Sequence, residues 1–208
     1  MTEKDQKLVV EGPDDQHVIW ALCQQHAVAE TFSVETTRSG GVEALLESIR
    51  VRLMEPGLRT LGVVLDADEI LERRWQAISD RLSREGYTAL PSIPDHEGTI
   101  IEEFDKPKVG IWLMPDNQLP GMLEDFIAHL IPQEDALRPK AERILAEIEE
   151  QNLHRYALVH HQKALIHTWL AWQRTPGQPM GQAITAQTLN HNQSLARSFV
   201  HWLNALFG

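Results

Sequence analysis

The chain has 208 residues and a formal net charge of −11, with 42% hydrophobic and 24% charged residues. These totals are typical of a globular protein with one large domain, or one domain and a helical appendage. They exclude a membrane-spanning protein, since no apolar run approaches the roughly 20 residues of a span. A single cysteine, Cys23, excludes an internal disulfide framework. The N-terminal sequence MTEKDQK lacks the features of a signal peptide, so we expect a cytoplasmic protein.

The charge is unevenly distributed along the chain. Residues 151–208 contain no Asp or Glu and four basic residues, so residues 1–150 carry a charge of −15. Affinity for nucleic acid comes largely from Lys and Arg contacts to phosphate. A nucleic-acid substrate would therefore require metal ions, a partner or the neutral-to-basic C-terminal part to offset the charge of the first 150 residues.

Strands and helices are predicted to alternate in residues 1–90. A short apolar strand at 8–10 is followed by Pro13, which suits the first turn of a helix. Hydrophobic spacing and turn residues then predict a strand at 32–37, a turn at 38–41, a helix at 42–53, a strand at 61–65, a helix at 71–85 and a short edge strand at 87–90. This alternation predicts an α/β fold with a parallel sheet flanked by helices.

The second half of the chain is predicted to be mostly helical. A turn-rich loop at 91–108, with a short hairpin strand at 98–101, leads to a buried strand at 109–114. Helices are then expected at 126–131, 135–150, 156–173, 181–189 and 194–207. A change of composition divides the chain into an α/β domain, residues 1–130, and an all-helical C-terminal region, residues 131–208, packed on it.

Acidic residues follow two of the predicted strands directly. Glu11 comes after the first strand, and the stretch LGVVLDADEI places Asp66 and Asp68 after the third. If the chain is still extended there, Asp66 and Asp68 project from the same side. Ligands of open α/β sheets bind outside the carboxyl ends of the strands. Glu11 and the two aspartates belong at one edge, provided that the first and third strands are neighbours, which the sequence does not prove.

Two further acids and one lysine extend this candidate site. Asp15 and Glu124 stand where helices begin, so each could simply favour a helix start. Together with Glu11, Asp66 and Asp68 they could instead surround one or two Mg²⁺ (or Mn²⁺) ions, which prefer oxygen ligands. Lys163 lies on an otherwise apolar helix, where it either extends to solvent or neutralises charge that develops in a transition state.

Several other kinds of site are disfavoured by the sequence. Dinucleotide binding and autonomous NTP hydrolysis are not expected, because GxGxxG and P-loop motifs are missing. The GxSxG nucleophile elbow is missing too. His160, His161 and His167 lack cysteine partners and an HExxH pattern, which disfavours zinc.

The string EGPDD (11–15) after the first strand, and DAD (66–68) after the third, resemble the Toprim domain of topoisomerases, bacterial primases and OLD-family nucleases. The resemblance implies that Glu11 and the Asp66–Asp68 pair bind Mg²⁺. Asp15 looks like the second acid of the OLD-type motif, Glu124 like its later glutamate and Lys163 like its downstream lysine. The strings VGIWLMPDNQLPGMLEDF (109–126) and KALIHTWLAWQRTPGQPMGQAI (163–184) resemble a prokaryotic Toprim-related family of unknown function.

These observations lead us to expect a Mg²⁺-dependent phosphodiesterase, a nuclease for DNA processing or phage defence. Glu11, Asp66, Asp68 and Lys163 would carry the catalysis. OLD-type proteins usually have an ATPase domain beside their Toprim, so the resemblance implies an ATPase partner protein; self-association is left open.

Two non-catalytic alternatives remain open. A receiver-like regulatory module also pairs acids after the first strand with an aspartate after the third. It needs a lysine after the fifth strand, however, and Lys108 precedes the strand at 109–114. A scaffold that binds metal or a partner and cleaves nothing would fit the charge of −15.

Overall fold

The computed structural model describes residues 4–37 and 41–208 and contains one mostly parallel sheet. Residues 38–40 of the expected turn lie outside the described residues. The sheet order is β2-β1-β3-β5-β4, with β1 (Gln6–Val10), β2 (Ser33–Thr36), β3 (Thr60–Asp66), β4 (Thr99–Ile101) and β5 (Lys108–Met114). Among the strands of the described residues, β4 alone pairs antiparallel, with β5. The hairpin strand expected at 98–101 is thereby confirmed.

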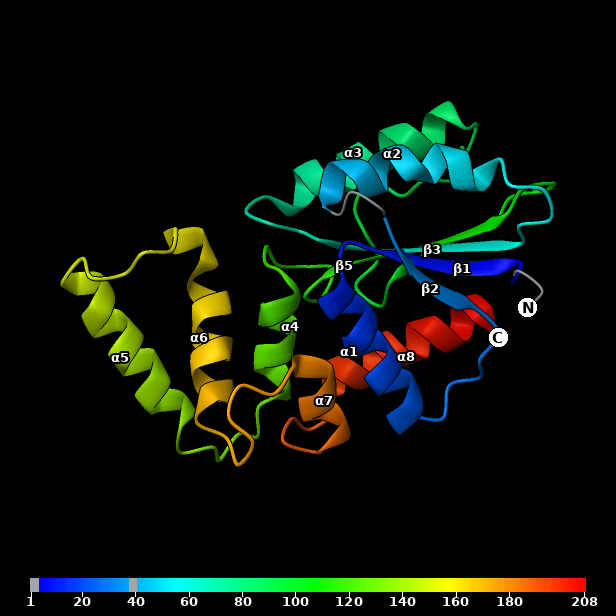
Figure 1. Cartoon of the computed structure of the whole chain (residues 1–208). Coiled ribbons are helices and arrows are strands. Elements are labelled where there is room, and N and C mark those ends of the chain that lie inside the picture. The colour runs from blue at the N-terminus through cyan, green and yellow to red at the C-terminus, as the bar shows by residue number, and fades with distance from the viewer. Residues whose placement is uncertain (1–3, 38–40) are drawn as a thin grey trace.

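Helices cover both faces of the sheet (Figure 1). They are α1 (Pro13–Gln25), α2 (Val42–Leu53), α3 (Leu71–Arg84), α4 (Leu123–Leu130), α5 (Arg138–Glu150), a 3₁₀ helix η1 (Leu158–His160), α6 (His161–Ala171), α7 (Met180–Thr185) and α8 (Ser194–Phe207). α2 and α3 lie on one face, while α1 and α8 lie on the other. This arrangement confirms the predicted α/β fold with a parallel sheet flanked by helices.

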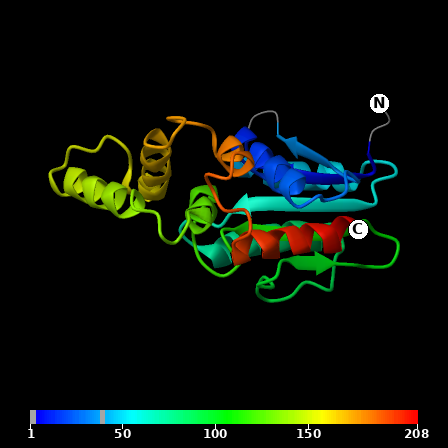
Figure 2. The same ribbon diagram turned by 90° about the horizontal axis from the view of Figure 1, so that it is seen from below.

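The helices after residue 130 take two different positions. α5 and α6 project to one side as a pair, whereas α8 runs along the sheet (Figures 1 and 2). Trp112 of β5 contacts Phe199 and Trp202 of α8, with ring centroids 5.1 and 5.7 Å apart. The division of the chain at residue 130 stays a prediction. In the described ranges no helix combines the length and the apolar character that crossing a membrane would require.

Two glycines allow α8 to pack closely on the sheet. Gly62 of β3 and Gly110 of β5 are register partners on adjacent strands. A Cβ atom added at Gly62 would lie 2.5 Å from Leu8 Cδ1, and one added at Gly110 would overlap the side chain of Leu206. Glycines in strand interiors often mark such close approaches. The absence of two side chains therefore makes the notch that Leu206 of α8 fills.

Gly110→Ala is expected to destabilise the protein, because the new methyl group overlaps Leu206. Overpacking of this kind costs about 1–3 kcal/mol, and each kcal/mol lowers Tm by roughly 2–4 °C in a protein of this size. Thermal unfolding measures the change. Leu206→Ala makes room for the methyl group, so the double variant should lose less stability than the sum of the single losses. Strict additivity would contradict this account of the packing.

The prediction of an edge strand at 87–90 is wrong, because a side chain and not a neighbouring strand accepts hydrogen bonds from the backbone N–H groups there. One carboxylate oxygen of Glu103 accepts hydrogen bonds from the N–H groups of Thr88 and Ala89. The Tyr87 hydroxyl donates to the carbonyl of Pro107 at 2.8 Å, which anchors the buried ring. The side chain of Glu103, fifteen residues after Thr88, thus provides the hydrogen-bond acceptor that a neighbouring strand would have provided.

Candidate metal centre

Parallel pairing brings the predicted acids to one edge of the sheet. β1 pairs with β3, and β3 pairs with β5, both in parallel. The carboxyl ends of the three strands therefore meet, and the adjacency on which the site depended is present. We call the acidic residues there the acid edge: Glu11, Asp15, Asp66, Asp68 and Glu124.

Glu11 and Asp66 are fixed by backbone hydrogen bonds. Glu11 Oε1 accepts a hydrogen bond from the Asp66 N–H at 2.9 Å, so the end of β1 is tied to the end of β3. Asp66 Oδ1 accepts one from the N–H of Leu123, the first residue of α4, also at 2.9 Å. Each carboxylate uses one oxygen in this way, and the other oxygen makes no hydrogen bond within the described residues.

Asp15 and Glu124 are nearly inaccessible, with 8% and 4% of their surface exposed. Asp15 Oδ2 accepts a hydrogen bond from the Gly12 N–H at 3.0 Å, closing a capping box at the start of α1. Glu124 stands in the first turn of α4, with Oε1 at 3.1 Å from Lys163 Nζ of α6. Both residues lie in the first turn of a helix, but a carboxylate that only favours the start of a helix does not need to be buried.

Asp68 departs from the expected geometry. Its φ of 54° places it in the left-handed region. The prediction of an extended backbone, which would project the Asp66 and Asp68 side chains from the same side, is therefore wrong. The chain turns there because Asp68 forms a backbone bridge: its N–H donates to Gly121 at 2.9 Å, and its carbonyl accepts from Gly121 at 2.8 Å. The carboxylate pairs with Arg74 and is 49% exposed, which leaves it at the rim of the acid edge.

Burial and mutual repulsion perturb the inner carboxylates. Burial, followed by the charges of Glu11, Asp15 and Glu124, raises the pKa of Asp66 to about 9. Burial and then the charge of Glu11 raise the pKa of Asp15 to about 7. Burial also raises the pKa of Glu11, against the hydrogen bond from the Asp66 N–H. Such a cluster is fully ionised at neutral pH only when a cation offsets it.

Two cationic side chains flank the acid edge. Burial lowers the pKa of Lys163, but the attraction of Glu124 outweighs it and raises that pKa overall. On the other side, Arg74 donates to the Asp66 carbonyl at 2.9 Å and pairs with the Asp68 carboxylate. In the described ranges neither cation forms a salt bridge with the carboxylates of Glu11, Asp15 or Asp66, so the gap among these three is not filled by a lysine or arginine head group.

Sequence reasoning missed Arg74. A signal was present, because Arg73 and Arg74 occupy the first turn of a predicted helix. Positive charge is unfavourable at that end of the helix dipole. Two arginines placed against this preference suggest an anionic neighbour, and Asp68 is that neighbour for Arg74.

The donors suit magnesium, although they do not form a closed cluster. Within residues 4–37 and 41–208, no three His, Cys, Asp or Glu side chains are arranged to hold a metal ion. Mg²⁺ binds one or two carboxylates directly and keeps several waters, so it does not need a closed all-protein cage. The oxygens of Glu11, Asp15 and Asp66 that make no hydrogen bond within the described residues are donors of the type that it prefers.

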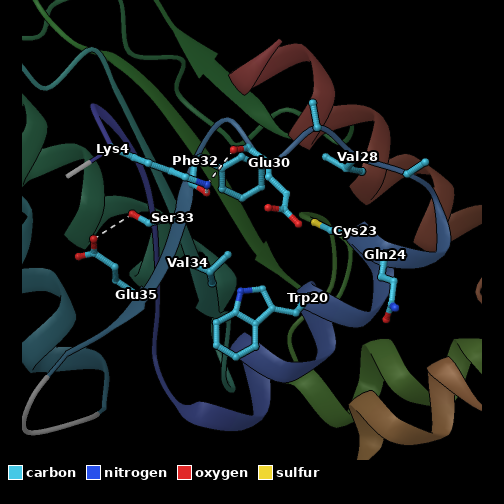
Figure 3. A pocket seen from close by; sticks show the side chains of 12 residues that line it. Lys4, Trp20, Cys23, Gln24, Val28, Glu30, Phe32, Ser33, Val34 and Glu35 are labelled. Carbon is cyan, nitrogen blue, oxygen red and sulfur yellow. Dashed lines mark hydrogen bonds between the residues drawn. The ribbon is translucent and has the colours of Figure 1, made fainter. Parts of the chain in front are cut away.

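A large hollow lies away from the acid edge. It has a volume of about 870 Å³ and lies between the second half of α1 and β2, with Trp20, Cys23 and Phe32 in its lining (Figure 3). Lys4 Nζ donates to the carbonyl of Phe32 at 3.0 Å beside it. Burial raises the pKa of the Cys23 thiol to about 11, which disfavours a reactive thiolate. No residue of the acid edge lines this hollow.

Solved structures similar to this chain come from OLD proteins. The C-terminal region of the Xanthomonas campestris pv. campestris OLD protein is 16% identical, with a TM-score of 0.48, over 99% of this chain and 97% of that one. The C-terminal region of the Burkholderia pseudomallei OLD protein is 12% identical, with a TM-score of 0.48, over 99% of both chains.

Sequence comparison places the chain in a family. No curated protein matches it. A family model described as "Protein of unknown function (DUF3226)" matches residues 5–208, nearly the whole chain. Membership in a family of unknown function, expected from the strings at 109–126 and 163–184, is thereby confirmed, while the relation of this family to Toprim stays a prediction. The chain therefore belongs to the DUF3226 family of proteins of unknown function.

Proposed function

We propose that this protein is a Mg²⁺- or Mn²⁺-dependent phosphodiesterase that cleaves nucleic acid, a Toprim-type nuclease. One observation carries the proposal: Glu11, Asp15 and Asp66 lie at the carboxyl ends of neighbouring parallel strands, close enough for Glu11 to raise the pKa of both aspartates, with no salt bridge to them within the described residues. Carboxylates that converge in this way are stable together when they are protonated or when a cation lies between them.

Glu11, Asp15 and Asp66 would hold the ion, with Asp68 and Glu124 completing the site. When bound, the ion supplies Lewis-acid catalysis of phosphodiester displacement. The hydrogen bond from the Asp66 N–H holds Glu11, and the one from the Leu123 N–H holds Asp66, so both carboxylates keep their direction.

Lys163 is suited to stabilise the charge that develops on a phosphate. Its side chain is 51% exposed, and its Nζ reaches the acid edge through Glu124. A raised pKa keeps it cationic at neutral pH. A lysine placed beside the reacting phosphate would neutralise a non-bridging oxygen in the transition state.

Cleavage assays test this proposal. Purified protein is incubated with labelled single- and double-stranded DNA and RNA in Mg²⁺, Mn²⁺ or EDTA. Glu11→Gln should reduce metal-dependent cleavage by at least about 100-fold, more than loss of a residue that only supports a metal ligand. Glu134→Gln is the matched control, because Glu134 is an exposed glutamate that does not belong to the acid edge. Cleavage that survives Glu11→Gln would overturn the proposal.

A metal-binding scaffold is the second candidate, favoured by the charge of −15 on residues 1–150. Calorimetric titration with Mn²⁺ separates the two functions. Binding without cleavage, both alone and with an ATPase partner, would identify a scaffold, whereas cleavage only with the ATPase would identify a nuclease that works in DNA processing or phage defence with a partner. A receiver is disfavoured, because Lys108 begins β5 and pairs with Glu102 at 2.9 Å, away from the acid edge.

A further inference from the structure

A second hollow adjoins the acid edge. It has a volume of about 340 Å³ and lies between α2, α3 and the loop that follows β3. Asp68 belongs both to the acid edge and to the wall of this hollow, so the two are neighbours. We call it the arginine hollow, because its lining includes Arg73, Arg74 and Arg81.

The three arginines share one face of α3. Arg81 lies seven and eight residues after Arg74 and Arg73, which is two helical turns. Ala77 stands between them and also lines the hollow. Because alanine has a small side chain, space remains between the two levels of guanidinium groups.

Two of these guanidinium groups are available to a ligand. Arg73 forms no hydrogen bond or ion pair within the described residues. Arg81 Nη1 donates to the Ala77 carbonyl at 2.9 Å, while Arg81 Nη2 lies 3.7 Å from Glu43, whose side chain is 78% exposed. Because so long a contact to an exposed carboxylate contributes little, Nη2 remains available to a ligand. Arg74 differs, since Asp68 and the Asp66 carbonyl already hold it.

The start of α3 also suits an anion. Its N-terminus has no side-chain cap, and Glu69 and Ile70, the residues just before the helix, line the hollow. Arg73 stands in the first turn, where the helix dipole disfavours a cation unless an anion is bound. Glu43, Asp68 and Glu69 balance the three arginines in formal charge when the hollow is empty.

We propose that the arginine hollow binds a phosphate of a single nucleic-acid strand, next to the phosphate at the acid edge, through Arg73 and Arg81. This inference rests on the proposed function. Guanidinium groups bind phosphate in a bidentate manner, which suits a site that positions one phosphate relative to another. The hollow would therefore set which part of the strand reaches the metal ligands, and it would supply cationic contacts within the acidic first 150 residues.

Binding and cleavage are measured separately to test this inference. Fluorescence anisotropy with labelled oligothymidylate, and in parallel oligouridylate, is recorded in EDTA over a series of salt concentrations. Arg73→Ala and Arg81→Ala should each weaken binding about tenfold. The double variant should lower the slope of log affinity against log salt by about 0.7, the value for one phosphate contact on a single strand. In cleavage assays the loss should appear in KM rather than in kcat.

Arg84→Ala is the matched control, because Arg84 is an exposed arginine of α3 outside the hollow. It should leave affinity, salt slope and KM unchanged. If Arg73→Ala and Arg81→Ala behave like Arg84→Ala while the protein cleaves nucleic acid, the inference is overturned and the proposed function stands. If the wild-type protein binds the oligonucleotides without cleaving them, and the two variants alone bind more weakly, the inference stands and the proposed function fails.

Discussion

Asp66→Asn is expected to abolish metal-dependent cleavage while making the metal-free protein more stable. Asp66 is the acid edge residue whose pKa is raised furthest, to about 9, by burial and by the surrounding carboxylates. Asparagine keeps an oxygen that can accept the hydrogen bond from the Leu123 N–H, but it carries no charge. The substitution therefore removes the need to protonate this position on folding and retains the local structure.

The two effects have different sizes and measurements. Cleavage should fall by at least about 100-fold. Asp66 must be protonated for the metal-free protein to fold at pH 8, whereas asparagine needs no proton, so the substitution should raise the free energy of unfolding by at least roughly 1.4 kcal/mol at pH 8 in EDTA, or about 2–4 °C in Tm for each kcal/mol. Glu134→Gln, which removes an exposed carboxylate outside the acid edge, should change neither quantity. A lower Tm for Asp66→Asn in EDTA would show that Asp66 stabilises the fold rather than serving a bound ion.

The metal-free protein is expected to lose stability as pH rises from about 5 to 9. The folded pKa values of Asp66, about 9, and Asp15, about 7, lie above the 3.8 of an ordinary aspartate. In this range the folded state binds more protons than the unfolded state, so raising the pH favours unfolding, by up to about 1.4 kcal/mol per pH unit for each proton. The contribution of each group is complete below pH 3.8 and is lost as the pH passes its folded pKa.

Thermal unfolding across this pH range, with and without Mg²⁺, measures the effect. Mg²⁺ binds ionised carboxylates, so its stabilisation should grow as the pH rises; at 100 times Kd it amounts to about 2.7 kcal/mol. Carboxyls whose pKa is lowered, such as Glu35, are ionised in both states above pH 5 and contribute little there. The difference between wild type and Asp66→Asn isolates Asp66. A metal-free Tm that rises steadily from pH 5 to 9 would contradict the pKa shifts.

Local patterns in the sequence were sufficient for the strands and helices of the α/β part. The apolar run ending at Asp66 is β3, and the spacing of Leu45, Leu46 and Ile49 gives the buried face of α2. Glu11 and Asp66 could be selected as candidates because acids that directly follow buried strands are costly without a partner. These features depend on residues close together in the chain.

Features set by distant residues could not be predicted. Asp68 adopts a left-handed conformation because it pairs with Gly121, more than fifty residues later. The strand expected at 87–90 is replaced by hydrogen bonds to Glu103. The position of α8 depends on Gly62 and Gly110. Their lack of side chains makes room for α8 only because β3 and β5 are neighbours in the sheet. No periodicity in the sequence encodes these long-range pairings.

The backbone bridge between Asp68 and Gly121 orders two loops of the acid edge before any ion binds. It joins the loop after Asp66 to the loop before Glu124, so protein hydrogen bonds alone fix the separation of these loops. An arriving cation would find its surroundings already ordered and would lose little conformational entropy in binding. Removal of the ion by a chelator would then leave both loops in place. The loaded and empty forms of the site would differ in the protonation of the carboxylates and not in the positions of the loops.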